Sequence, residues 1–352
     1  MNRGALCSIR TAYLSSLGAL ALSLTLASEA TAEPQTRREV VEAVAARVQA
    51  QYVFVDKGAK AARLIRSHAK RGDYDKPVSE KEFAQVLTAD IYAVTKDKHL
   101  VVRYSAAGYP PIEPAGTNDL AARAADLLAM KRSNYSVPRA EVLAGNVGYL
   151  KIELFQPPRE AGPTLVAAMN FLANTDSLIF DLRDNGGGDA AAVALVLSYL
   201  TAPQTQLVSY RNRDGKETQS WTPPYAPGGP WSTTRPVYVL TNGKTFSAAE
   251  EFAFDLQQLK RATIVGGQSR GGANPGLILP IGVHYRMFLP NETAVGPLSG
   301  GNWEGAGVTP DVPTEPAKAL PTAHRLALQA LLSKADDAEK PALEDALKSV
   351  GE

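Results

Sequence analysis

The sequence contains a single cysteine, Cys7, which lies close to the N-terminus. One cysteine cannot build a disulfide framework or a thiolate zinc site. The four histidines, His68, His99, His284 and His324, show no HExxH or HxH spacing, so the pattern of a zinc hydrolase is missing too. We therefore expect neither a metal ion nor another cofactor.

An excess of charge is also missing, because 37 Lys+Arg face 36 Asp+Glu and the formal net charge is +1. A neutral chain has no overall field to hold nucleic acid, so we expect no nucleic-acid partner. Apolar residues make up 45% and charged residues 21%, values that are ordinary for a soluble globular protein. The length of 352 residues predicts about two domains.

Long apolar runs are absent except for residues 12–27, which are rich in Leu and Ala. Arg3 and Arg10 precede this run, and Ala30-Thr31-Ala32 follow it. A basic start, an apolar centre and a small-x-small end are typical of a secretory signal peptide, here cleaved before Glu33. We expect residues 1–32 to be a signal peptide and the protein to be periplasmic or secreted.

A membrane anchor is the alternative interpretation of residues 12–27. Serines and Gly18 interrupt the run, and it is shorter than the roughly 20 apolar residues that span a bilayer. Lipid attachment is not expected at Cys7, because that residue precedes the run. We expect no membrane span after signal cleavage, and the sequence leaves the oligomeric state open.

Residues 33–105 show the spacing of amphipathic helices. Val40, Val44 and Val48 recur on one helical face. Ser79 stands three residues before Glu82, as in a capping box. We expect a helical N-terminal domain over 33–105, followed by a linker and a helix over 106–145.

The pattern changes near residue 146, where short, almost fully apolar runs begin to alternate with helical segments. The runs with strand character are 147–152, 177–182, 237–241 and 263–266. Such alternation predicts an α/β core with a central sheet flanked by helices, which we place at 146–318. Residues 319–352 are predicted to form C-terminal helices.

Three consecutive glycines, Gly186, Gly187 and Gly188, follow the apolar run 177–182 and precede a helical segment. Exposed backbone N–H groups at the start of a helix favour an anion, either a phosphate or an oxyanion. Neither GxGxxG nor GxxxxGK[ST] is present, so an oxyanion is favoured over a phosphate. A flexible turn is the simpler alternative.

Ser247 follows the strand 237–241 and an Asn-Gly turn, and it precedes a helix. A strand, tight turn and helix resemble a nucleophile elbow, although GxSxG is absent. Spacing alone favours the simpler interpretation, a helix N-cap whose capping box is closed by Glu250.

Four strings, VGYLKI, LIFDLRDNGGGD, TNGKTFSAAEEFAFDLQQLKRATIVG and NWEGAGVTPDV, resemble the tail-specific (C-terminal processing) serine peptidase family. The branch they resemble more closely contains the tricorn core protease and the interphotoreceptor retinoid-binding modules. The resemblance extends from about Val40 to Pro313. It implies a crotonase-like α/β core with a helical N-terminal domain, and it aligns Ser247 with the family nucleophile.

The resemblance also implies how the serine would be activated. In the C-terminal processing branch a lysine acts as the base, but its position is Gly272 here. In the tricorn-like branch the base is a histidine assisted by a glutamate. The string KDKHLVVRY implies His99 as this base, with Lys98 where the family has glycine, and Glu304 takes the glutamate position. The implied catalytic residues are therefore Ser247, His99 and Glu304.

Several alternatives remain open at this stage. His284 is the reserve base, and Glu304 could instead be a loop carboxylate that pairs with an arginine. The oxyanion donors implied are the amides of Ala248 and of Gly186 or Gly187. About 40 residues separate Tyr104 from Val147, too few for a PDZ module of roughly 90 residues, so we expect no PDZ module.

The sequence thus predicts an exported serine peptidase that cleaves peptide or protein substrates through an acyl-enzyme. One alternative is a non-catalytic binding module for a hydrophobic ligand or peptide, because one fold can serve unrelated functions. The other is an esterase or amidase that acts on non-peptide acyl groups by the same chemistry.

Overall fold

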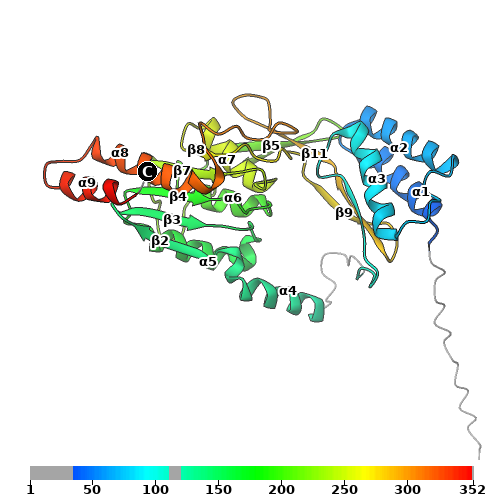
Figure 1. Cartoon of the computed structure of the whole chain (residues 1–352), viewed down its shortest axis with the longest axis horizontal. Coiled ribbons are helices and arrows are strands. Elements are labelled where there is room, and N and C mark those ends of the chain that lie inside the picture. Colours follow the sequence, from blue (N-terminus) through cyan, green and yellow to red (C-terminus); the bar gives the residue numbers. More distant parts are fainter. Residues whose placement is uncertain (1–34, 111–119, 351–352) are drawn as a thin grey trace, which may run out of the picture. The chain divides into compact units, whose positions relative to one another are not determined.

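The computed structural model describes residues 35–110 and 120–350. The predicted signal peptide and most of the Pro/Gly-rich linker therefore lie outside the described residues. The described residues from Thr36 onward belong to one compact unit, which is shown in Figure 1. None of the helices among the described residues is long and apolar enough to cross a membrane.

The N-terminal region consists of three helices, α1 (Arg37–Gln51), α2 (Val55–Lys70) and α3 (Glu80–Thr95). Capping boxes fix two of their starts: Thr36 with Glu39 at α1, and the predicted pair Ser79 with Glu82 at α3. The buried faces of the helices meet in a common apolar core. The predicted helical region is confirmed.

An antiparallel sheet of three strands completes this helical core. Its spatial order is β1 (Val101–Tyr104), β10 (Tyr285–Pro290), β9 (Gly276–Pro280). Tyr285, Met287 and Leu289 point into the helical core, so the residues between them face the other way. The segment 276–290 therefore belongs with the N-terminal helices in space, although it lies in the second half of the sequence.

The central sheet predicted from the alternation of strands and helices is present and has six strands. Its spatial order is β12 (Val312–Pro313), β8 (Thr263–Gly266), β7 (Val237–Thr241), β4 (Ser177–Asp181), β3 (Val147–Lys151), β2 (Arg139–Leu143). All neighbours are parallel except β2 with β3. The expectation of only linker and helix over 106–145 is wrong at β2, where charged residues on a half-exposed edge strand concealed the strand pattern.

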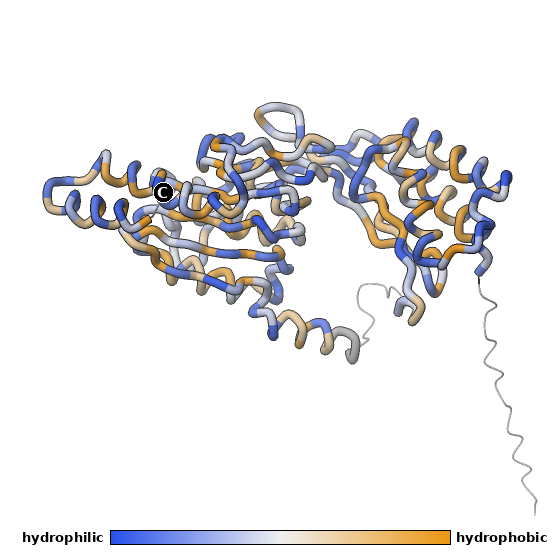
Figure 2. Tube along the Cα trace, in the orientation of Figure 1, coloured by the Kyte–Doolittle hydropathy of each residue, from blue (hydrophilic) through white to orange (hydrophobic). Residues whose placement is uncertain are grey.

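Helices cover both faces of the central sheet. Alternate strand residues such as Phe180 and Val239 pack with α5 (Pro158–Phe171), α6 (Ala190–Leu197) and α7 (Ala248–Gln258). Their neighbours Ile179 and Tyr238 pack against α8 (Ala319–Leu332) and α9 (Lys340–Ser349) on the opposite face. Figure 2 shows the hydrophobic stretches along these strands. Burial on both faces explains why the strands are almost entirely apolar in sequence.

Smaller elements complete the fold. They are a second three-stranded antiparallel sheet with the order β11 (Glu292–Val295), β5 (Gln206–Asn212), β6 (Glu217–Trp221), the helix α4 (Leu120–Arg132), and the 3-10 turns η1 (Asn134–Ser136) and η2 (Pro316–Lys318). The mixed α/β architecture with a helical N-terminal region is confirmed. The crotonase-like assignment and the missing PDZ module stay predictions.

Candidate active site

Ser247 occupies the turn between β7 and α7 in a backbone conformation that side chains rarely adopt. Its φ is 56° and its ψ is −124°. A non-glycine residue with such a positive φ stores strain on the order of 1–3 kcal/mol, and such strain is concentrated at functional sites. The serine is half-buried and is also the N-cap residue of α7. The two interpretations of Ser247, a helix N-cap and an elbow-like turn, are therefore compatible.

A buried carboxylate holds the elbow in this conformation. Glu250 is completely buried and accepts the N–H of Ser247 at 2.8 Å. It also accepts the Ser269 hydroxyl at 2.6 Å and the N–H groups of Gly271 and Gly272 at 2.6 and 2.8 Å. Burial raises the pKa of Glu250, and these four donors oppose the rise. Glu250 is thus more than a cap, because it ties the 269–272 loop to the serine.

The triple-glycine loop is fastened to the same turn by Asn185, a completely buried residue. Its side chain accepts the N–H of Gly187 at 2.8 Å and donates to the Ile152 carbonyl at 3.1 Å, while its own carbonyl accepts the N–H of Phe246 at 3.1 Å. The two loops meet closely, because a Cβ placed on Gly187 would lie 2.8 Å from the Cβ of Ser247. A larger residue at Gly187 would push the serine out of position.

The backbone N–H groups around Ser247 differ in availability. The N–H of Gly187 is already bonded to Asn185. Those of Gly186 and Ala248 have no hydrogen-bond partner within the described part of the chain. Gly186 is exposed and lines a cavity. Of the two glycines predicted as oxyanion donors, Gly186 has the available N–H group. Gly187 instead leaves room for the Ser247 side chain, because it has no Cβ.

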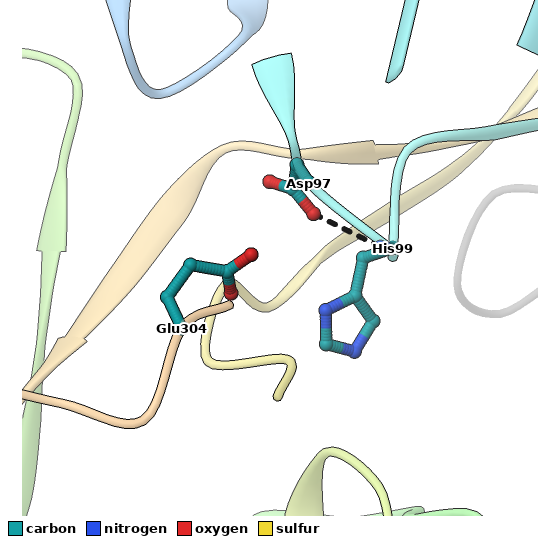
Figure 3. Close-up of side chains that lie close together, drawn as sticks. All are labelled: Asp97, His99 and Glu304. Atoms are coloured by element: carbon teal, nitrogen blue, oxygen red, sulfur yellow. Dashed lines mark hydrogen bonds between the residues drawn. The ribbon is translucent and has the colours of Figure 1, made fainter. Parts of the chain in front are cut away.

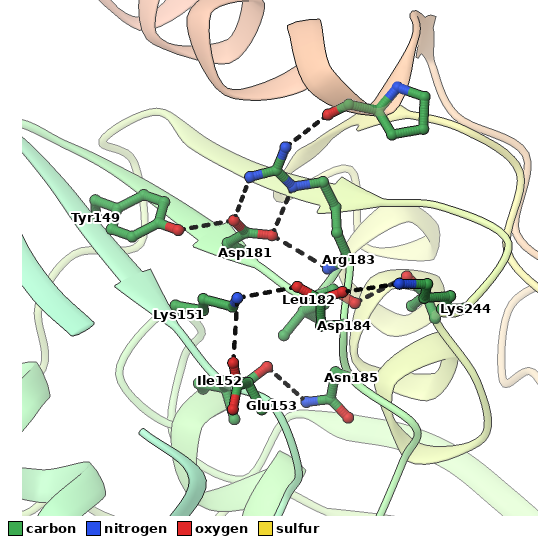
Figure 4. A network of polar contacts seen from close by, with 12 residues as sticks. Tyr149, Lys151, Ile152, Glu153, Asp181, Leu182, Arg183, Asp184, Asn185 and Lys244 are labelled. Carbon is green, nitrogen blue, oxygen red and sulfur yellow. Dashed lines mark hydrogen bonds and ion pairs between the residues drawn. The ribbon is translucent and has the colours of Figure 1, made fainter. Parts of the chain in front are cut away.

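The start of the glycine loop is fixed by a polar network shown in Figure 4. The buried Asp181 accepts the backbone N–H and the guanidinium Nε of Arg183 at 3.1 and 2.9 Å, and the Tyr149 hydroxyl at 2.7 Å. Asp184 pairs with Lys151 at 2.9 Å and with Lys244 at 3.4 Å. These bonds hold the turn from which the glycine loop begins.

His99 lies next to the elbow. Its ring lies between two phenylalanines, with the centroid 4.3 Å from that of Phe246 and 5.4 Å from that of Phe288. Its backbone N–H donates to Asp97 at 2.9 Å, as drawn in Figure 3. Asp97 is buried and also accepts the Tyr52 hydroxyl at 3.0 Å and the Asn274 amide at 2.9 Å. Asp97 thus joins α1, the histidine turn and the loop before β9.

Glu304 faces the same ring, and Figure 3 shows a ring nitrogen of His99 turned toward its carboxylate. The His99 Nδ1 and the Glu304 Oε1 are both buried without a hydrogen-bond partner among the described residues. The second oxygen of Glu304 accepts the N–H of Ala273 at 2.6 Å. The two groups lie within 4.8 Å of each other, so a small approach would form a bond between them. No arginine pairs with Glu304 in the described part of the chain, contrary to the alternative reading.

Burial moves the pKa values of both groups. It lowers the pKa of His99 to about 4, with a further contribution from the nearby Arg270 cation. It raises the pKa of Glu304 to about 7, with help from the negative charge of Asp97. His99 is therefore a neutral imidazole at pH 7, as a general base requires, and the proton of the pair resides on Glu304 in acid.

The C-terminal processing branch has a lysine at the position of Gly272. Here the His99 ring occupies the space beside that position. A Cβ placed on Gly272 would lie 2.7 Å from the His99 Cε1 and 2.2 Å from the Phe246 ring. The loop passes so close to the imidazole that only glycine fits. The position of the His99 ring therefore requires glycine at position 272.

The remaining histidines are engaged away from this cluster. The Nδ1 of His284 lies 3.0 Å from the Ser105 carbonyl oxygen. His68 pairs with Asp90 at 2.8 Å, and His324 lies 2.8 Å from the Ala144 carbonyl. The reserve base His284 is therefore not in contact with the elbow.

Asp97, His99 and Glu304 are also the one group among residues 35–110 and 120–350 whose ligand atoms could hold a metal ion, all within 4.8 Å of one another. Both oxygens of Asp97 already accept hydrogen bonds. The arrangement serves a proton-transfer pair at least as well as it would serve a metal ion.

Sequence reasoning missed Asp97, Asn185 and the larger role of Glu250. Asp97 stands two residues before His99, which was the available local signal. The partners of Glu250 in the 269–272 loop have no signal in the local sequence.

Comparison with known proteins gives two family matches. The model of "Peptidase family S41" matches residues 146–314, and that of the "N-terminal domain of Peptidase_S41 in eukaryotic IRBP" matches residues 24–132. A carboxy-terminal-processing protease of Bartonella bacilliformis is 32% identical over 197 residues, which are 54% of this chain and 42% of that protein. A carboxyl-terminal-processing protease of Synechocystis is 33% identical over 128 residues, 36% of this chain and 28% of that protein. The chain thus aligns with less than half the length of either protein.

Solved structures share the fold. A lipoprotein from Streptococcus agalactiae superposes with a TM-score of 0.56 at 16% identity, over 86% of this chain and 96% of that one. A photosystem II D1 C-terminal processing protease gives a TM-score of 0.52 at 16% identity, over 88% and 100%. At such low identity the likeness concerns the fold alone.

Proposed function

Because the chain belongs to peptidase family S41, we propose that it is a serine peptidase in which Ser247 is the nucleophile, His99 the general base and Glu304 the partner of the histidine. The observation that carries the proposal is a strained serine turn whose preceding residue, Phe246, packs against a neutral, buried imidazole beside a carboxylate. A serine hydroxyl needs a neighbouring base to become a nucleophile.

The proposed reaction begins when His99 takes the proton of the Ser247 hydroxyl as the oxygen attacks a peptide carbonyl. The imidazolium formed in this step turns its Nδ1–H toward Glu304, whose carboxylate holds the ring and stabilises the positive charge. The tetrahedral oxyanion lies on the N–H groups of Gly186 and Ala248. The imidazolium then protonates the leaving amine, and water releases the acyl group from Ser247 by the reverse roles.

Two features support catalysis over the binding-module alternative. A carrier of hydrophobic ligands would enclose its ligand in a dry apolar cavity with the serine covered. Here Ser247 is half-buried, and the adjacent cavity of about 520 Å³ is lined by several cations. An esterase or amidase would use the same atoms, so substrate tests separate that alternative.

The experiment is hydrolysis of a mixture of quenched fluorescent peptides by the wild type, Ser247→Ala and His99→Ala. We expect cleavage by the wild type and losses on the order of 10³-fold or more in both variants. Unchanged circular dichroism and melting temperatures would exclude unfolding as the cause. A Ser247→Ala variant with wild-type activity would overturn the proposal.

We further propose that the protein is exported. The support is the sequence pattern of residues 1–32, with its basic start, apolar run and Ala-Thr-Ala end. Intact-mass analysis of protein recovered outside the cytoplasm should show a chain that begins at Glu33. Recovery of the uncleaved chain in the membrane fraction would favour an anchor instead.

A further inference from the structure

Lys98 immediately precedes the proposed base His99, and its side chain binds two loops from the second half of the chain. Its ammonium group donates to the carbonyl of Arg270, and to the carbonyl of Gly305 at 3.3 Å. These acceptors lie 172 and 207 positions further along the sequence. The branch that the sequence resembles has glycine at this position, which has no side chain to make such bonds.

One acceptor belongs to the loop that carries the carboxylate of the proposed triad. Gly305 directly follows Glu304, so a bond to its carbonyl fixes the backbone beside that carboxylate. The Glu304 Oε1 and the His99 Nδ1 are both buried without a hydrogen-bond partner among the described residues. The two groups therefore do not hold each other in place, and the anchors of their backbones decide how closely they approach.

The other acceptor belongs to the loop that is tied to the serine turn. Arg270 directly precedes Gly271, whose N–H donates to the Glu250 carboxylate at 2.6 Å. Glu250 in turn accepts the N–H of Ser247 at 2.8 Å. Through these bonds the Lys98 ammonium group is connected to the proposed nucleophile as well as to the base and its partner.

The two loops that Lys98 binds are in close contact with each other. The N–H of Gly305 donates to the Gly271 carbonyl at 3.3 Å, and the N–H of Val308 donates to the Ser269 hydroxyl at 2.6 Å. A Cβ placed on Gly271 would lie 2.7 Å from the carbonyl carbon of Gly305. An ammonium group has three donors on a flexible stem, so one lysine can bind both loops where they meet.

The positive charge of Lys98 also acts on the carboxylate. Burial is the main cause of the raised pKa of Glu304, and the negative charges of Asp97 and Glu250 contribute to it. The N–H of Ala273 and the Lys98 cation act in the opposite direction. Lys98 therefore favours the ionised form of Glu304, which is the form that can accept a proton from an imidazolium.

We propose that Lys98 is a positioning residue, which holds the Glu304 loop and the 269–272 loop at the distance from His99 that catalysis requires. The proposal rests on the proposed peptidase function. Lys98 acts through the backbone of these loops, because its ammonium group already donates to two carbonyls. Its loss should therefore slow the chemical step more than it weakens substrate binding.

The test compares Lys98→Met, which keeps the length of the side chain but removes its donors and charge, with Lys98→Arg, which keeps both. On one peptide we expect Lys98→Met to lower kcat about tenfold with less than about a threefold change in KM. Lys98→Arg should retain at least about a third of the wild-type kcat, because a guanidinium can donate to the same carbonyls.

Lys57→Met is the matched control. Lys57 also donates to a backbone carbonyl, that of Thr95 at 3.2 Å, but this bond lies within the helical N-terminal region. We expect wild-type kcat in this variant, and unchanged melting temperatures of all variants would exclude unfolding as the cause. A wild-type kcat in Lys98→Met, or a change confined to KM, would overturn the proposal.

A second readout needs no hydrolysis and is made in the Ser247→Ala background. The NMR resonance of the His99 Cε1–H, identified by its loss in His99→Ala, is displaced by the ring currents of Phe246 and Phe288, whose centroids lie 4.3 and 5.4 Å from that of the imidazole. Lys98→Met should shift this resonance, whereas Lys98→Arg and the control should leave it in place. An unchanged resonance in Lys98→Met would overturn the proposal. A shifted resonance combined with a wild type that cleaves no peptide would support the positioning contact and overturn the peptidase alone.

Discussion

The pH dependence of activity is where the geometry of His99 and Glu304 makes its sharpest prediction. The pKa of His99 is lowered to about 4 and that of Glu304 is raised to about 7. The last proton to leave the pair on raising the pH thus leaves from Glu304, and only then can the carboxylate accept the Nδ1–H of the imidazolium. We expect kcat/KM to fall tenfold per pH unit below a midpoint near pH 7.

Glu304→Gln removes this titration. The remaining group is His99, so the midpoint should move from near 7 to below about 5, in the direction of the lowered pKa of the histidine. Activity above pH 8 should also drop on the order of 10²- to 10⁴-fold, because the imidazolium loses its anionic partner.

The assay is a kcat/KM profile from pH 5 to pH 9 on one peptide for the wild type and Glu304→Gln, with circular dichroism at each pH. A midpoint near 7 in both proteins would show that another group titrates and would remove Glu304 from the mechanism. A wild-type profile that is flat over this range would refute the assignment of the pair as a whole.

Three further substitutions test the surroundings of the site. Burial raises the pKa of Glu251 to about 7, so the native state loses stability as the pH rises through 7. Glu251→Gln should remove this loss. It should raise the free energy of unfolding at pH 9 by up to roughly 3 kcal/mol, seen as a higher melting temperature, and change little at pH 5. Gly272→Ala should reduce kcat at least about tenfold with a smaller change in KM, since its methyl group would meet the His99 ring; wild-type kinetics in this variant would show that the loop yields. Ser247→Gly should raise the free energy of unfolding by about 1 kcal/mol in denaturant titrations, because glycine adopts the positive φ without strain; a destabilised variant would show that the serine is not strained.

The parts of the fold that were visible in the sequence are those with strong local periodicity. The strands β3, β4, β7 and β8 are buried on both faces and therefore apolar throughout, and the capping box at Ser79 marked the start of α3 correctly. The strand β2 was missed because its half-exposed edge position tolerates Arg139 and Glu141. β6 was missed for a related reason, since it is mostly exposed and polar.

The assignment of the candidate site depended on its family strings, and most of its supporting contacts had no signal in the local sequence. Asn274 bonds to Asp97 across 177 positions of sequence. Glu250 was read as a local cap, because its spacing from Ser247 is a cap spacing, whereas its bonds to the 269–272 loop depend on the tertiary fold. Local patterns cannot register contacts that arise when separate loops are brought together at the ends of the central strands.

The central claim is that Ser247 is a nucleophile activated by His99. The most direct measurement is labelling by a fluorophosphonate probe, followed by peptide mass mapping, in the wild type, Ser247→Ala and His99→Ala. We expect one label per chain on Ser247 in the wild type, none in Ser247→Ala, and labelling slowed at least about 100-fold in His99→Ala. A label on another serine, or equally fast labelling of Ser247 without His99, would contradict the central claim.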